Sequence, residues 1–239
     1  MARLALLALV ALVALVAPAG RAGAAAEDLE DLVLGELAGY MIDEDVDGPF
    51  DLEAFIPLLP VREDGEALGG ATRAVYARLF VPDGSVAVPP AGAVVVLLFE
   101  LKDPDDVGGF VEGFDEGAQS KADYAAFAVP GLRSAVGARF GDGDGNLVEA
   151  VAVPRAPYAL AVAALAGTGA RTLAIEVAVA QDQRLRQALA DDGGPGPVVA
   201  GDDSGTGAAQ EVGMVVATVL LVGVTARLVL ALVDRSRER

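Results

Sequence analysis

The sequence predicts an α+β domain, in which a mainly antiparallel sheet has helices packed against it, followed by one C-terminal transmembrane helix. Several segments of strand length alternate apolar and polar residues or are almost wholly apolar. Other segments repeat apolar residues every three or four positions, which is typical of an amphipathic helix. Aromatic residues make up only 5% of the chain against 54% hydrophobic residues, so we expect a core of alanine, valine and leucine.

The first half of the domain contains two predicted strands. Thr72–Val81 alternates in character, and Ala93–Leu101 is nearly all apolar, as expected for a strand that is covered on both faces. Upstream, leucine and valine recur at helical spacing in Glu27–Tyr40 and predict a short amphipathic helix. Asp51 can cap a brief helix that ends near Leu59.

The clearest predicted helix follows the second strand. Asp103 is suited to cap it, and Pro104 occupies its first position, where proline is favoured. The apolar positions that follow have the spacing i, i+3, i+4, i+7: Val107, Phe110, Val111 and Phe114. We therefore expect this helix to lay one apolar stripe on the sheet and to show Glu112, Asp115 and Glu116 to water.

The second half predicts an antiparallel meander that ends in a helix. Its three strands are Leu132–Phe140, Leu147–Val153 and Tyr158–Ala166, separated by turns rich in glycine, aspartate and proline. Thr168 is predicted to cap the closing helix, Ala170–Leu189.

The string F-A-V-P-G at Phe127–Gly131 stands between the capped helix and the meander. With the order of strand pair, helix, meander and closing helix, the segment Thr72–Ala190 resembles small exported α+β domains of actinobacteria, whose fold is similar to the PsbP-like sandwich. The resemblance implies a domain that is not an enzyme. It carries over no functional residue.

The N-terminus predicts export. Arg3 precedes the apolar run Leu4–Val16, and the small residues Ala22–Ala26 supply a cleavage site. We therefore assign 1–26 as a signal peptide and 27–190 as an extracytoplasmic domain. An uncleaved signal anchor is the alternative.

The C-terminus predicts a membrane anchor. Residues 212–233 would form a helix of about 33 Å, enough to cross a bilayer, and the arginine-rich tail 234–239 places that end in the cytoplasm. Gly213 and Ala217 make a small-x-x-x-small pattern, which is weak evidence for helix association in a chain so rich in small residues. The glycine-rich stretch 191–211 is predicted to be a flexible stalk.

Arg227 interrupts the predicted span. It lies past the midpoint, so its guanidinium can reach the cytoplasmic interface. Alternatively, it can pair with an acidic residue of a partner helix, which would make the chain an accessory subunit of a larger membrane complex. A membrane-protein partner is therefore one hypothesis for its function.

Composition excludes several classes of chemistry. The chain has no cysteine and no histidine, so disulfides, thiolate nucleophiles, Ser-His-Asp triads and histidine-ligated metals are impossible. The net charge of −18 argues against nucleic acid as a partner. The sequence favours non-catalytic ligand or partner binding, or a structural role in the cell envelope, with the ligand unknown. A carboxylate-dependent hydrolase is the alternative, although a chain without tryptophan is poorly suited to stack sugars.

Two acidic regions suggest cation binding without requiring it. Asp142, Asp144 and Asn146 alternate as a calcium loop begins, but Leu147 and Val153 stand where an EF-hand needs glycine and glutamate. A hairpin turn explains the same residues, and Ca²⁺ at this loop is the alternative. The segment 27–66 holds 14 acidic residues and one basic residue. A solvated face is preferred there over a surface for a cation or a basic partner.

Overall fold

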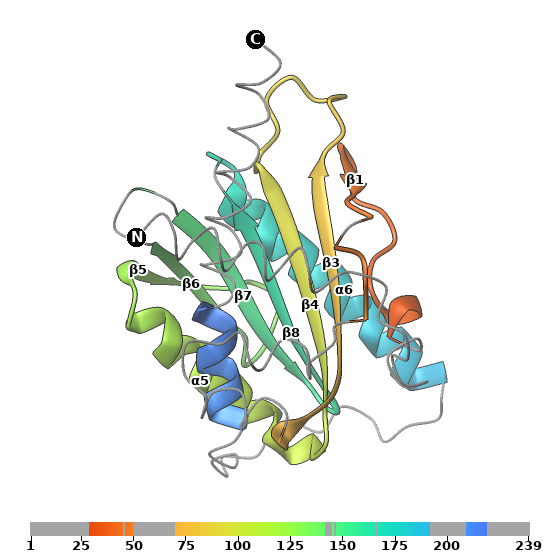
Figure 1. The fold of residues 1–239 in the computed structure, drawn as a ribbon, viewed down its shortest axis with the longest axis vertical. Helices are drawn as coiled ribbons and strands as arrows, with labels where there is room; N and C mark the ends of the chain where they lie inside the picture. The colour runs from red at the N-terminus through yellow and green to blue at the C-terminus, as the bar shows by residue number, and fades with distance from the viewer. Residues whose placement is uncertain are drawn as a thin grey trace.

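The computed structural model shows an α+β fold with one eight-stranded antiparallel sheet and helices on both of its faces (Figure 1). The strand order is β1-β3-β4-β8-β7-β6-β5, and β2 also pairs with β3. This confirms the predicted α+β class and antiparallel sheet. The structure describes residues 29–44, 46–49, 70–141, 145, 147–165, 167–191 and 209–218.

The strands are short at the edges of the sheet and long at its centre. The strands are β1 (Tyr40–Ile42), β2 (Gly48–Pro49), β3 (Thr72–Pro82), β4 (Ala93–Leu101), β5 (Ala122–Phe127), β6 (Val136–Gly141), β7 (Leu147–Arg155) and β8 (Tyr158–Leu165). The helices are the 3-10 turns η1 (Glu30–Leu32) and η3 (Pro104–Asp106) and the α-helices α5 (Val107–Gln119) and α6 (Ala170–Asp191). Residues 209–218 are also helical.

The centre of the sheet is formed by β4 and β8, which pair from Ala93↔Leu165 to Glu100↔Tyr158. Successive side chains on each strand point to opposite faces, and both faces are buried along most of these two strands. As predicted, Ala93–Leu101 is continuously apolar because both faces of this strand are covered.

Each face of the sheet has its own core. One is covered by α5 and by 209–218, the other by α6 and by the chain from Leu29 to Leu37. On the first face, Phe110 and Phe114 of α5 are fully buried, and the Phe110 ring lies 5.2 Å from that of Phe99. The predicted apolar stripe of this helix is confirmed.

The helix predicted for Glu27–Tyr40 is wrong. Between Leu29 and Tyr40, the part of this range that the structure describes, only Glu30–Leu32 forms a 3-10 turn, and Tyr40 already begins β1. The turn ends at Val33, whose φ of −90° and ψ of 145° are extended backbone angles. The side chain of Gln181 on α6 holds the chain instead: its amide nitrogen donates to the Leu32 carbonyl, and its oxygen accepts from the Leu34 amide. Leu29 and Val33 are thus buried, and the leucines at 32, 34 and 37 are partly buried, without an α-helix.

The other predicted elements agree with the structure except for the first strand of the meander. It was predicted for Leu132–Phe140 but begins only at Val136, because Ser134 has a φ of +61°, a left-handed conformation that interrupts an extended strand. Asp103 caps as expected, with its carboxylate accepting from the Asp105 amide at 3.0 Å, and the first turn after it is 3-10 before α5 begins. The meander is β6, β7 and β8, and the closing helix runs on to Asp191. The strand β5, which pairs with β6 at the edge of the sheet, was not predicted.

Several predictions concern residues outside the described ranges. These are the signal peptide 1–26, the brief helix after Asp51, most of the stalk, residues 219–233 of the anchor and the tail. Within the ranges that the structure describes, no helix combines the length and apolar character needed to cross a membrane.

Candidate helix-docking site

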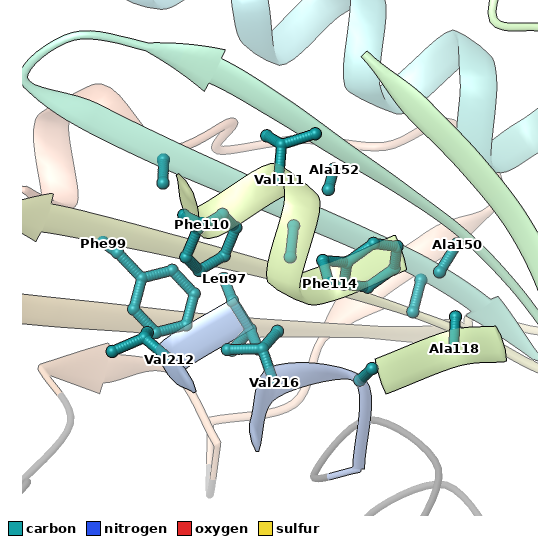
Figure 2. Close-up of a cluster of buried hydrophobic side chains, with 14 of the residues drawn as sticks. Leu97, Phe99, Phe110, Val111, Phe114, Ala118, Ala150, Ala152, Val212 and Val216 are labelled. Carbon is teal, nitrogen blue, oxygen red and sulfur yellow. The ribbon is translucent and has the colours of Figure 1, made fainter. Parts of the chain in front are cut away.

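The helix 209–218 lies beside α5 and contains the first residues of the predicted anchor (Figure 1). Val212 and Val216 are 0% and 3% exposed. They belong to the same core cluster as Leu97, Phe99 and Phe110, and Figure 2 shows these side chains together. The start of the predicted anchor is therefore packed into the core of the domain.

Glycines bring the two helices into backbone contact. A methyl group on Gly113 would overlap with the carbonyl oxygen of Gln210, and one on Gly117 would lie 2.8 Å from the Cα of Met214. From the other side, a methyl group on Gly213 would overlap with the Phe110 carbonyl. No residue larger than glycine fits at these three positions without movement of backbone.

The glycine content of α5 needs such a contact. Four of its 13 residues are glycine, and each costs about 0.5–1 kcal/mol relative to alanine in a helix interior. Close approach of backbones offsets this cost through van der Waals contact and Cα–H···O interactions. The small residues are spaced by four on both helices: Gly109, Gly113 and Gly117 against Ala209, Gly213 and Ala217.

We call the receiving part of the domain the α5 docking surface, and its residues are Leu97, Phe99, Phe110, Gly113 and Gly117. Its floor is β4, whereas α5 itself packs over β5 to β8. At the rim, the Gln210 side chain donates to Glu116 Oε2 at 3.0 Å. The sequence analysis noted the pattern at Gly213 but missed the matching one on α5, although the glycine count of that helix was a usable signal.

A buried ion pair on the opposite face fixes the N-terminal segment to β3. Arg78 donates from Nε and Nη2 to the two carboxylate oxygens of Asp47, at 2.6 and 3.1 Å, and from Nη1 to the Leu34 carbonyl. The Tyr76 hydroxyl donates to the same carboxylate at 2.9 Å. Burial, followed by this hydrogen bond to Asp47, raises the pKa of Tyr76. The side chains of Arg78, Asp47 and Tyr76 therefore stabilise one another and have a structural role.

A second polar cluster holds α6 on the sheet. Asp182 is 1% exposed and accepts from Arg155 of β7 at 2.6 Å and from Arg186, one turn further along α6, at 2.7 Å. Arg184 donates to the Asp31 carbonyl from two nitrogens. These contacts tie three separate parts of the chain together.

An open hollow beside β1 has acidic side chains in its lining, so it is the candidate site for a carboxylate-dependent hydrolase. Its lining includes Glu36, Met41, Glu44, Asp47, Phe80 and Asp83. Hydrogen bonds from Ser85, by its hydroxyl and its backbone amide, lower the pKa of Asp83, whereas a general acid needs a raised one. Asp47 is already held by Arg78. The hollow therefore gives the hydrolase alternative no support.

The other candidate residues lie outside the described ranges: Asp142, Asp144 and Asn146 for Ca²⁺, and Arg227 for a membrane partner. The hairpin around the first three pairs Gly141 with Leu147, and Gly145 has a φ of +94°. In the described part of the chain, no group of three or more acidic side chains is placed to hold a metal ion.

Comparisons of this chain with protein-family models, with curated proteins and with solved structures find no match.

Proposed function

We propose that this chain is a single-pass membrane protein whose acidic extracytoplasmic domain binds a partner or ligand, or supports the cell envelope, without catalysis. The predicted signal at 1–26 and the predicted anchor at 212–233 supply the topology. The domain stands outside the membrane, and the short arginine-rich tail lies in the cytoplasm.

One observation carries the binding role: the domain holds an apolar helix on the α5 docking surface. Val212 and Val216 are buried there, and backbone meets backbone at Gly113 and Gly213. A surface built of glycine, leucine and phenylalanine recognises a helix by shape. The buried charged groups Arg78 and Asp182 and the half-buried Asp47 already have protein partners, which agrees with a structural use of those side chains.

The test is membrane extraction combined with protease accessibility in sealed cells. We expect the full chain to stay in the membrane pellet after alkaline carbonate treatment, since an inserted helix resists this wash. We also expect external protease to reach the domain and to leave an epitope fused after Arg239 intact.

A variant truncated before Val212 is the matched control, and it should be released into the supernatant. Release of the full chain by carbonate would refute the anchor. A domain that external protease reaches only after the cells are opened would refute the topology.

A further inference from the structure

We infer that the α5 docking surface and the lipid bilayer compete for the same segment, 209–218, so that docking and full insertion of the predicted anchor exclude each other. This inference rests on the proposed function, because it requires 212–233 to be the anchor. It assigns a second partner to those residues: the surface formed by Leu97, Phe99, Phe110, Gly113 and Gly117.

Length is the first argument. Seven residues of the predicted span, 212–218, are helical and packed on the domain. Only the fifteen residues 219–233 remain, and as a helix they would extend about 22 Å. The hydrocarbon core is about 30 Å thick. A docked segment therefore leaves too little chain to cross an unperturbed bilayer.

The position of Arg227 is the second argument. In the full span 212–233 it lies several residues past the midpoint and can reach the cytoplasmic interface. In the shortened span 219–233 the midpoint is residue 226, so Arg227 falls almost at the bilayer centre when that span is centred in the membrane, and a charge is least tolerated there. Docking thus makes the remaining span both shorter and more polar at its middle.

Occupancy of the surface is the third argument. Val212, Val216 and Ala217 are at most 3% exposed in the docked arrangement, so the domain buries them as fully as lipid would. Leaving the surface would uncover Leu97 and Phe99 on β4. The segment 209–218 can therefore occupy either of two apolar environments, the α5 docking surface or the bilayer, but not both at once.

The experiment uses crosslinking in membranes that contain the full chain. Glu116→Cys with Gln210→Cys places one thiol on each helix at the rim, where the native side chains lie within hydrogen-bond distance, and the chain has no other cysteine. A short bis-maleimide then traps the docked state. Glu176→Cys with Gln210→Cys is the control pair, since Glu176 is exposed on α6, which covers the opposite face of the sheet. Flotation of salt-washed membranes at neutral pH reports insertion of each species.

We expect crosslinked chains of native anchor length to be lost from the floated membranes, while uncrosslinked chains float. Insertion of about seven leucines between Leu221 and Val222 should keep crosslinked chains in the membrane and raise the crosslinking yield, because the docked span is then long enough and Arg227 again lies past its midpoint. Crosslinked chains of native length that float as well as uncrosslinked ones would overturn the competition. Equal crosslinking of the control pair, or none of the Glu116–Gln210 pair with either anchor length, would overturn docking. Loss of uncrosslinked chains from the membrane would instead refute the anchor itself.

Discussion

The two faces of the sheet hold their helices by different physical means. The α6 face uses polar side chains with defined partners: Gln181 on the backbone of 32–34, Arg78 on Asp47, and Asp182 between two arginines. The α5 face uses contact between small and apolar residues, with glycines that bring backbones together. Hydrogen bonds and ion pairs therefore attach the elements on one face of the sheet, whereas close packing attaches those on the other.

This difference determines which face of the sheet can release the helix that covers it. Removing a buried polar partner leaves another polar group unsatisfied, which costs about 1–3 kcal/mol and more for a charge. Separating two apolar surfaces has no such penalty if lipid or another helix replaces the contact. The α6 face is therefore suited to a permanent attachment, and the α5 face to a helix that can leave.

The largest expected effect comes from breaking the polar face at its ion pair. Asp47→Ala would leave the 5% exposed side chain of Arg78 without its carboxylate, and we expect the free energy of unfolding to fall by about 3–5 kcal/mol. Asp47→Asn keeps an acceptor oxygen and should cost less. Urea unfolding measures both. Asp83→Ala is the control at an exposed carboxylate and should lose much less stability than Asp47→Ala; an equal loss in this control would contradict the structural role of the pair.

A matched pair of alanine substitutions on α5 tests the glycine contact. Gly113→Ala would place a methyl group on the Gln210 carbonyl, and we expect a loss of about 1–3 kcal/mol by overpacking. Gly108→Ala meets nothing within 4 Å and should stabilise the helix by about 0.4–1 kcal/mol. Thermal unfolding of the full chain in detergent compares the two. Effects of the same sign would show that helix propensity, and not packing, governs both sites.

The smallest effect is a pH dependence that belongs to the polar face. Burial raises the pKa of Tyr76 above its ordinary value of 10.0, so its contribution is complete below pH 10. As the pH rises further, the unfolded chain releases the phenolic proton while the folded chain retains it, and the free energy of unfolding falls. The slope is at most about 1.4 kcal/mol per pH unit for one tyrosine. Tyr76→Phe should reduce the slope in urea unfolding between pH 9 and 11 without abolishing it, because burial also raises the pKa of Tyr40. An unchanged slope would show that groups other than Tyr76 cause the loss of stability at alkaline pH.

Elements with local causes were predictable from the sequence. The cap at Asp103 and the apolar stripe of α5 are set by neighbours within a few residues, and the apolar run of β4 follows from its central position. The strand β5 was missed because it contains no β-branched residue and depends on pairing with β6. The segment after Leu29 has helical spacing, yet Gln181, 147 residues from Leu34, holds it extended. No local pattern could have shown that contact.

The docking surface was half predictable for the same reason. The pattern at Gly213 was visible in the sequence, and so were the four glycines of α5, but their pairing joins helices about ninety residues apart. Gln210 and Glu116, which mark the contact, are 94 positions from each other. Only the fold brings the two patterns together.

Alanines beneath α5 set how near that helix comes to the strands. Ala150 and Ala152 of β7 and Ala159 and Ala161 of β8 are fully buried on this face, so the volume of the layer is supplied by the phenylalanine rings of the helix (Figure 2). A larger residue on either strand would push α5 away from the sheet and change the shape of the α5 docking surface. The affinity for that segment can thus be tuned from the strands beneath α5.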